Sequence, residues 1–395
     1  MRRPSSSVTL ICCLLLAACT SGTTASTTTT TTRESTTTTS EPLFQLPDPG
    51  AAVEHVELHA IDDNEMVLAY TTRSSAGHRL WVSVIDDGMP SQPTRVAEGV
   101  TDIPLAEFRP SIAVSPQGKI AVAWTSLDSD VYVAISEDGG VTFGEAIRMN
   151  TEPRGMQLLP AVTYVGETLH GVWIDPRDAP ENAEEPADLY MWTLAGDRTL
   201  ETNLTDTQIP SVCGCCRPHL EARDGELWIT FRNTTADGYR DPYQMTPDTE
   251  PIAVTPPTWQ IEACPIAGPV AANDRVIWLD GSTGHARILV SNGPEAEPDL
   301  LLDSTTDFRI TGGPRPVSGI DDLVLIPGTP ESRLIRPDGG SVDLSLPPSA
   351  STAAVHGGVL VVLGVEGGRF DLEVHDIEQR LGSTGAGRGG AALMG

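Results

Sequence analysis

The chain has 395 residues, and its 54 acidic and 25 basic side chains give it a formal net charge of −29 at pH 7. Binding to phosphate backbones needs a basic surface, so this balance argues against nucleic acid as a partner. The 37 glycines and 32 prolines separate short apolar runs, and long helical patterns are missing. This pattern predicts an all-β protein.

The first 18 residues have the pattern of an export signal. Arg2 and Arg3 precede an apolar run at 8–18, which is too short to span a bilayer as a helix. The run ends in Leu-Ala-Ala-Cys at 16–19, which matches the lipobox of bacterial lipoproteins. We expect cleavage before Cys19 and lipid on its thiol, which would anchor the protein at the extracytoplasmic face of the cell membrane. The alternative is an ordinary secretory signal in which Cys19 occurs by chance.

Low-complexity segments flank the central part of the chain. Residues 20–41 are almost entirely Thr and Ser, and residues 382–395 are rich in Gly. The Thr/Ser segment has no apolar surface to bury and the tail is dominated by Gly, so both are expected to be disordered. With the lipidated Cys19, residues 19–41 would form a tether with an average reach of about 25 Å. One folded domain is then expected over residues 42–381.

A unit of about 50 residues recurs through this domain. Each unit has a strand that begins at a proline, a turn rich in Gly, Asp and Asn, and a strongly apolar strand that often ends in an aromatic residue. The first strands begin at Pro110, Pro160, Pro218, Pro269 and Pro316. The second strands lie at 66–70, 120–124, 169–173, 227–231, 275–278, 323–326 and 359–363.

A repeat of this length holds four strands, which is the blade of a β-propeller. Seven second strands predict one monomeric propeller of seven blades, with six blades as an alternative and a pair of β-sandwiches as a different architecture. Trp124, Trp173 and Trp278 recur at the second-strand position and are expected in the core. The last unit lacks an outer strand, which residues 44–46 or 53–61 would supply.

A hairpin in the second unit carries a known motif. Ser136, Asp138, Gly140, Thr142 and Phe143 fit the Asp-box pattern S-x-D-x-G-x-T-F. The Asp can accept hydrogen bonds from turn amides, the Gly allows a positive φ, and the Phe can fill apolar space beside the sheet. Through this motif and the blade repeat, the chain resembles the sialidase-like (BNR/Asp-box) propellers over about residues 50–380.

Two cysteine-containing segments indicate which sialidase-like proteins the chain resembles most. Residues 213–218 read C-G-C-C-R-P, and residues 264–269 read C-P-I-A-G-P. Between them lie Phe-Arg-Asn at 231–233 and Arg-Asp at 240–241. The chain is therefore most similar to a subgroup of bacterial sialidase-like proteins with C-x-C-C-x-P and C-P-x-x-G-P segments. This resemblance implies no defined activity.

Three arginines, Arg109, Arg217 and Arg315, precede the prolines that open first strands. Equivalent positions in different blades should face one mouth of the central channel, where guanidinium groups could bind a carboxylate. The alternative is that they cap strands and pair with carboxylates of the protein. Catalytic sialidases also need a Tyr–Glu nucleophile pair, but no tyrosine follows Tyr243. The sequence therefore argues against sialidase catalysis.

Four cysteines remain after the signal and the lipid site, namely Cys213, Cys215, Cys216 and Cys264. We expect them to cluster at the same channel mouth. Outside the cytoplasm an even number of thiols favours disulfides, one of which would join Cys264 to the C-x-C-C segment. The alternatives are redox chemistry and a thiolate site for Cu(I) or zinc, with His219 as a further ligand, although C-x-C-C is not a standard zinc spacing.

These observations predict a surface-anchored propeller that binds an anionic glycan or a protein partner, without sialidase catalysis. The binding residues are expected at one channel mouth and are Arg109, Arg217, Arg232, Arg240, Asp241 and Arg315. One alternative is a glycoside hydrolase or lyase that acts on acidic glycans. The other is a surface protein that handles copper or zinc at the cysteines, and no other cofactor is expected.

Overall fold

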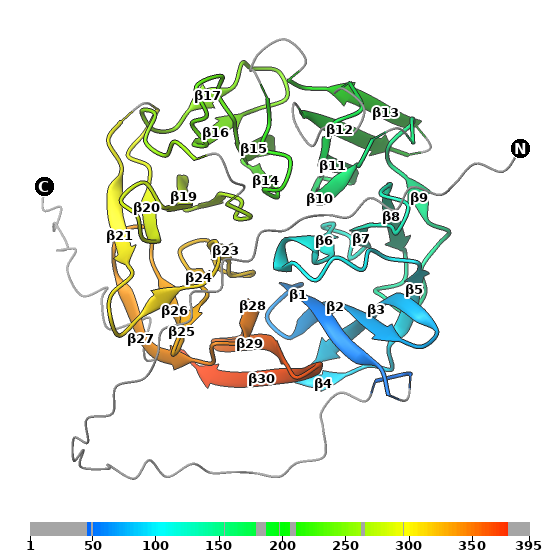
Figure 1. Ribbon diagram of the computed structural model, residues 1–395. Helices are drawn as coiled ribbons and strands as arrows, with labels where there is room; N and C mark the ends of the chain where they lie inside the picture. Colours follow the sequence, from blue (N-terminus) through cyan, green and yellow to red (C-terminus); the bar gives the residue numbers. More distant parts are fainter. Residues whose placement is uncertain are drawn as a thin grey trace, which may run out of the picture. The chain divides into compact units, whose positions relative to one another are not determined.

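The computed structural model describes residues 46–48, 50–153, 155–178, 187–196, 198–205, 211–261, 265–294 and 296–377. Within them seven antiparallel sheets form blades in a ring around a central channel, and an eighth sheet is a small two-stranded pair (Figure 1). The prediction of an all-β propeller with seven blades is confirmed. The predicted signal peptide, Cys19, the tether, Cys264 and the C-terminal tail lie outside the described residues.

In the first three blades the strands follow chain order from the channel outward. Blade 1 consists of β1 (Ala52–Ala60), β2 (Glu65–Ser74), β3 (Gly77–Asp86), β4 (Met89–Pro90) and β5 (Thr94–Glu98), and the last two both pair with β3. Blade 2 consists of β6 (Ser111–Val114), β7 (Ile120–Thr125), β8 (Val131–Ser136) and β9 (Ile147–Arg148). Blade 3 consists of β10 (Leu158–Val165), β11 (Thr168–Asp175), β12 (Asp188–Ala195) and β13 (Arg198–Asn203).

The remaining blades are built in the same way. Blade 4 consists of β14 (His219–Arg223), β15 (Glu226–Arg232), β16 (Pro242–Met245) and β17 (Ile252–Ala253), and blade 5 of β18 (Val270–Ala272), β19 (Arg275–Asp280), β20 (Arg287–Val290) and β21 (Asp299–Asp303). Blade 6 consists of β23 (Arg315–Pro316), β24 (Val324–Ile326), β26 (Ser332–Ile335) and β27 (Ser341–Leu346), beside the small pair of β22 (Arg309–Ile310) and β25 (Gly328–Thr329). Blade 7 consists of β28 (Ala350–His356), β29 (Val359–Glu366) and β30 (Arg369–Asp376).

The hydrophobic core lies mainly between neighbouring blades. Successive side chains of a strand point to opposite faces, so each blade presents one apolar face to each neighbour. Trp173 of β11 packs between blades 2 and 3, and Phe231 of β15 packs between blades 3 and 4. The predicted core tryptophans Trp124, Trp173 and Trp278 are 5%, 0% and 0% exposed. The ring is therefore held together by a repeated apolar layer.

The ring closes by direct packing of blade 1 on blade 7. Leu58 of β1 and Tyr70 of β2 share one buried cluster with Leu363 of β29. Residues 53–61 supply the innermost strand of blade 1, because the short connection at 61–64 pairs β1 with β2. The prediction that this segment completes the last blade is therefore wrong. Blade 7 has three strands among the described residues.

The hairpin after β8 is held by its own side chains. Asp138 accepts hydrogen bonds at 2.8 Å from the Thr142 amide and at 2.6 Å from the Thr142 hydroxyl, and these bonds lower its pKa to about 2. The Ser136 hydroxyl oxygen accepts a 2.7 Å bond from the Gly140 amide. Phe143 packs against the cluster between blades 1 and 2. These contacts fix the turn on the outer part of blade 2 and leave it apart from the channel.

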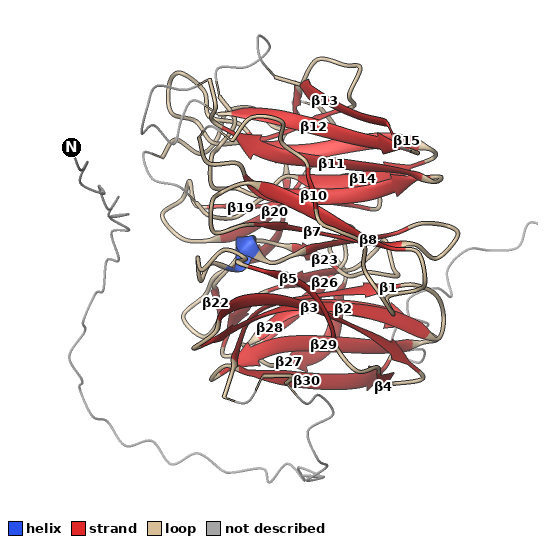
Figure 2. Cartoon of the chain, turned by 90° about the vertical axis from the view of Figure 1, so that its right-hand side faces the viewer, coloured by secondary structure: helices blue, strands red, loops and turns tan. Residues whose placement is uncertain are grey.

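Figure 2 shows the ring from its side, with the strands of successive blades lying over one another. The 3-10 helix η1 (Ala106–Phe108) is the only helical element among the described residues, and it leads into the first strand of blade 2. No helix in the described part of the chain is long and apolar enough to cross a membrane.

Candidate functional site

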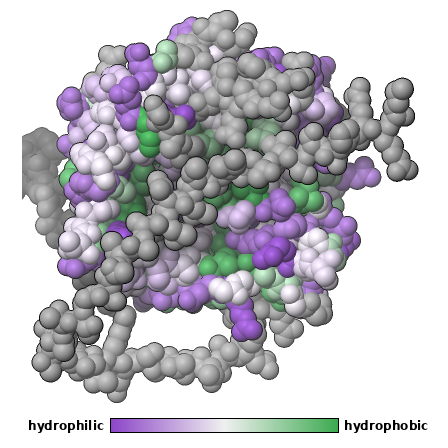
Figure 3. Space-filling model, in the orientation of Figure 1, coloured by the Kyte–Doolittle hydropathy of each residue, from purple (hydrophilic) through white to green (hydrophobic). Residues whose placement is uncertain are grey.

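The central channel contains a cavity of about 510 Å³. Its wall is formed by the innermost strands of blades 1 to 6 and by the loops that follow or precede them. In Figure 3 hydrophilic residues cover much of the rim, and hydrophobic residues are visible toward the hollowed centre. Because residues of six blades line this cavity, it is the candidate ligand site.

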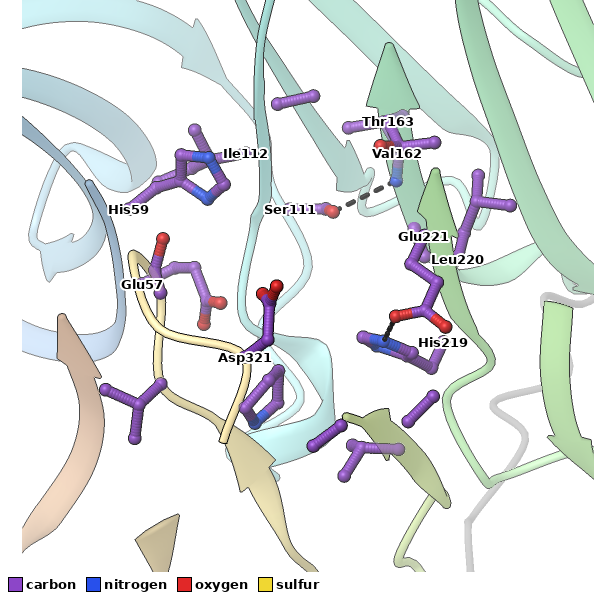
Figure 4. Close-up of a pocket in the computed structure, with 18 of the residues that line it drawn as sticks. Glu57, His59, Ser111, Ile112, Val162, Thr163, His219, Leu220, Glu221 and Asp321 are labelled. Carbon is purple, nitrogen blue, oxygen red and sulfur yellow. Dashed lines mark hydrogen bonds and ion pairs between the residues drawn. The ribbon is translucent and has the colours of Figure 1, made fainter. Parts of the chain in front are cut away.

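Two innermost strands present titratable side chains to this cavity in pairs (Figure 4). Glu57 and His59 lie two residues apart on β1, and His219 and Glu221 lie two residues apart on β14. Residues at this spacing point to the same face of a strand, so each pair faces the channel. Sequence reasoning missed three of these four residues, although the spacing of polar residues within the innermost strands would have indicated them.

The two pairs differ in their electrostatics. Burial lowers the pKa of His59, and the nearby Glu57 carboxylate opposes this shift. The His219 Nε2 atom lies 3.7 Å from the Glu221 Oε2 atom. Burial raises the pKa of Glu221, but His219 and Arg223 outweigh it, so the pKa lies below its usual value. Both pairs thus place an imidazole near a carboxylate.

Asp321 adds a third carboxylate from a different blade. It follows β23 in a loop, and in Figure 4 it extends into the space between the β1 and β14 pairs. Its side chain is exposed. No ion pair joins Asp321 to another described residue, so its carboxylate is available to a ligand in the cavity.

Arg109 and Arg217 also line the cavity, at the end where first strands begin. The Arg109 Nε atom is 2.7 Å from Glu57 Oε2, and its Nη1 atom is 3.8 Å from Glu107 Oε2. Burial lowers the pKa of Arg109, but these two carboxylates outweigh it and raise the pKa above its usual value. The guanidinium is therefore already neutralised by the protein.

Arg217 donates to backbone oxygens of two neighbouring blades. Its terminal nitrogens lie 3.2 Å from the carbonyl of Glu107, 2.5 Å from that of Arg109, 3.4 Å from that of Pro110 and 2.8 Å from that of Pro160. Burial, with a contribution from Arg109, lowers the pKa of Arg217 to about 9. Both terminal nitrogens are thus engaged in joining blade 4 to blades 2 and 3.

The other predicted mouth residues do not line the cavity. Arg315 is 7% exposed and donates to the Ser351 carbonyl, and burial lowers its pKa to about 10. Arg232, at the end of β15, is fully buried between blades 4 and 5. Arg240 and Asp241 precede β16, where Asp241 accepts a 2.6 Å bond from the Thr258 hydroxyl. Arg315 lies on an innermost strand, but it is bonded to blade 7. The other three residues lie on a second strand or in the loop after it, away from the channel.

The cysteines of the C-x-C-C segment form a compact cluster. The Sγ atoms of Cys213, Cys215 and Cys216 lie within 4.8 Å of one another, the one such group of potential metal ligands among the described residues. Cys213 and Cys216 are free thiols, whereas Cys215 is disulfide-bonded. No two described cysteine sulfurs are at disulfide distance, since the shorter separations are 3.2 and 3.7 Å. A disulfide between any two of Cys213, Cys215 and Cys216 is therefore not supported, and Cys264, the predicted partner, lies outside the described residues.

The two free thiols have different acidities. The hydrogen bond with Cys216, together with the charges of Arg232 and Arg240, lowers the pKa of Cys213 to about 6 against the opposing effect of burial. Burial raises the pKa of Cys216. The pair therefore consists of one thiol that ionises readily and one that stays protonated.

Comparison with known proteins places the fold in its class. No protein-family model and no curated protein matches the sequence. The structure is similar to the BP39L lectin from Burkholderia pseudomallei, with a TM-score of 0.55 and 11% identity over 82% of this chain and 97% of the lectin. It is also similar to the β-propeller domain of the Trilobed protease from Pyrococcus furiosus, with a TM-score of 0.52 and 11% identity over 83% of this chain and 96% of that domain.

Weaker likenesses extend to sialidase-like and related propellers. A neuraminidase-like protein from A/bat/Guatemala/164/2009 matches with a TM-score of 0.43 and 12% identity over 72% of this chain and 83% of that chain. Glycoside hydrolases and a polysaccharide lyase match with TM-scores of 0.42 to 0.45. At these identities the likeness defines the fold alone. The protein belongs to the class of β-propellers.

Proposed function

We propose that this protein is a propeller displayed on the outside of the cell by lipid on Cys19, and that it binds a neutral or cationic oligosaccharide in the central channel. The observation that carries the proposal is the set of polar side chains that face one cavity of about 510 Å³ from separate blades. Glu57, His59, His219, Glu221 and Asp321 offer acceptors and imidazoles to sugar hydroxyl groups. Apolar side chains between them, such as Ile112 and Leu220, suit the faces of sugar rings.

The charge of the ligand follows from the partners of the arginines. Arg109 is paired with two carboxylates, and Arg217 donates to four carbonyl oxygens. An anionic glycan would have to displace these contacts, and the Asp321 carboxylate, which has no ion pair with a described residue, would repel it. We therefore favour a ligand without negative charge over the acidic glycan that the sequence suggested. Binding without sialidase catalysis is expected, because no tyrosine follows Tyr243 to act as the nucleophile of that mechanism.

A panel of neutral, amino-sugar and acidic oligosaccharides tests this proposal. We expect binding of a neutral or amino-sugar member, and a loss of affinity of about tenfold or more in Asp321→Asn and in Glu221→Gln, since each removes a charged acceptor. Asp299→Asn is the matched control, because Asp299 is an exposed residue of the outer strand β21. Binding confined to acidic glycans, or affinity that is equal in all variants, would contradict the proposal.

The anchor is tested separately. In a bacterial host the full chain should appear in the membrane fraction, and Cys19→Ser should move the protein to the soluble extracytoplasmic fraction. Mass spectrometry of the mature N-terminus should find acyl chains on Cys19 in the unaltered protein. A soluble product with an unmodified N-terminus would show that the segment is an ordinary secretory signal.

A further inference from the structure

A tight turn in the wall between blades 4 and 5 holds two free thiols in contact. Cys213 and Cys216 have the C-x-x-C spacing, and the Cys216 amide donates to the Cys213 carbonyl at 3.3 Å. The Cys213 amide in turn donates to the Arg232 carbonyl at 2.8 Å, which ties the turn to β15. The two Sγ atoms are 3.2 Å apart, and both residues are 0% exposed. The fold thus holds two thiols closer together than packing alone requires.

The surroundings of this pair are positively charged. The Arg240 Nη1 atom donates to the Cys213 sulfur at 3.3 Å. The fully buried guanidinium of Arg232, among the described contacts, donates only to the carbonyl oxygens of Ala267, Arg240 and Leu279. A buried positive charge is stabilised by an anion nearby, and the thiolate of Cys213 is placed to supply one.

We propose that Cys213 and Cys216 form a redox-active dithiol that is oxidised by hydrogen peroxide, with Cys213 as the attacking thiolate and Cys216 as the resolving thiol. This site is separate from the channel ligand and does not depend on the proposed oligosaccharide. The class of oxidant follows from burial, because two fully buried sulfurs are out of reach of a disulfide on another protein. A molecule as small as hydrogen peroxide can reach them through local opening of the turn.

The reaction balances in two steps. The Cys213 thiolate attacks one oxygen of the peroxide, the O–O bond breaks, and Cys213 sulfenic acid forms as hydroxide leaves and takes up a proton to become water. The Cys216 sulfur then attacks the sulfenic sulfur, the S–O bond breaks, and a second water leaves with the Cys216 proton. The two thiols have lost two electrons and the peroxide has gained them. The S–S distance need close only from 3.2 Å to about 2.05 Å.

The same distance argues against a metal as the occupant of this pair. Two thiolates bound to one tetrahedral zinc ion at about 2.3 Å lie about 3.8 Å apart. The observed separation of 3.2 Å is shorter than that. Cys215 is disulfide-bonded, so the turn offers two free ligands where structural zinc sites use four. The geometry is that of a dithiol and not of a metal site.

The experiment uses the full mature chain and one equivalent of hydrogen peroxide, followed by alkylation of the remaining thiols and peptide mass spectrometry. We expect the loss of two thiols and a new bond mapped to Cys213 and Cys216. Oxidation in the folded protein should be at least about tenfold faster than in the urea-unfolded protein. Two thiols that survive, oxidation no faster than in the unfolded chain, or a bond mapped to another cysteine would overturn the proposal.

Matched variants separate the two roles. Cys216→Ser should retain a sulfenic acid on Cys213, which dimedone traps, and Cys213→Ser should leave the Cys216 thiol intact over the same period. Arg240→Gln should slow the first step by about tenfold, because the donor to the thiolate is lost. A sulfenic acid that instead forms on Cys216 would overturn the assignment. The wild-type measurement decides the proposal even where a variant fails to fold.

Discussion

The Nη1 atom of Arg240 lies 3.3 Å from the Sγ atom of Cys213, inside the wall between blades 4 and 5. The carbonyl of Arg240 accepts a hydrogen bond from Arg232, whose own carbonyl accepts one from the Cys213 amide. These three residues therefore form one closed network. Arginines that the sequence suggested for a ligand mouth instead connect the cysteine turn to the fold.

The first prediction concerns the buried arginine of this network. Arg232→Met should lower the free energy of unfolding by about 3 kcal/mol, because the carbonyl oxygens of Ala267, Arg240 and Leu279 would stay buried without their donor. Urea unfolding followed by tryptophan fluorescence measures this change. Arg95→Met is the control, since Arg95 lies on the exposed strand β5 and should change stability by less than about 0.5 kcal/mol. Equal effects of both variants would contradict the proposed role of Arg232.

The second prediction concerns the arginine that joins three blades. Arg217→Lys should destabilise the protein by about 2 kcal/mol, because one ammonium group cannot reach the carbonyls of both Arg109 and Pro160 as two guanidinium nitrogens do. The comparison is Arg73→Lys, whose side chain is 62% exposed in its ion pair with Glu54. Thermal unfolding of both variants gives the difference. A wild-type melting temperature in Arg217→Lys would show that these contacts do not stabilise the ring.

The third prediction separates two glycines of the hairpin after β8. Gly139 and Gly140 both have positive φ, at 69° and 89°, but a Cβ on Gly140 would lie 2.8 Å from Val84 Cγ2, whereas one on Gly139 meets nothing within 4 Å. Gly139→Ala should therefore cost about 1 kcal/mol from backbone strain alone. Gly140→Ala should cost at least about 1 kcal/mol more, from overpacking against blade 1. If the two substitutions cost the same, the close approach to Val84 is without effect.

The fourth prediction is a pH dependence of stability. Burial lowers the pKa of His55 from 6.5 to about 4, against the opposing effect of Glu54. Because the folded-state pKa lies below the unfolded one, the unfolded state binds the proton more readily between these values. Stability should be full above pH 6.5 and should fall as the pH drops toward 4, by about 3 kcal/mol in total from this group.

Urea unfolding between pH 4 and pH 7 measures this dependence. In His55→Gln the fall in stability over this window should be smaller by the contribution of His55. His375→Gln on the outermost strand β30 is the control and should keep the wild-type slope. An NMR titration of the His55 ring with a midpoint near 6.5 would contradict the prediction directly.

The blade pattern was readable in the sequence because it depends on local chemistry. Apolar second strands that recur at a regular spacing must be covered on both faces, and a ring of blades is an arrangement that does so. The buried positions of Trp173 and Trp278 follow from that periodicity. The place of residues 53–61 did not follow, because the choice between opening blade 1 and completing blade 7 depends on which distant strand they contact.

Some contacts of the channel residues could also be predicted from local sequence, and others could not. His59 and Glu221 lie on innermost strands at a spacing of two from another polar residue, so a search for that spacing would have found them. The partners of Arg217 could not be found in this way. They are backbone carbonyls, and every residue of the chain has one.

The sequence by itself determined the all-β class and the seven-fold repeat, and it predicted export and a lipid anchor. Each of these depends on composition or on the pattern of residues close together in the chain. Only the tertiary structure decided which of the conspicuous side chains meet. In the tertiary structure Arg109 pairs with carboxylates and Arg217 donates to backbone carbonyls, whereas Asp321 lines the cavity. The tertiary structure also brought the two free thiols of Cys213 and Cys216 to 3.2 Å beside Arg240. Contacts between groups far apart in the chain depend on how the blades pack, and local sequence does not specify that packing.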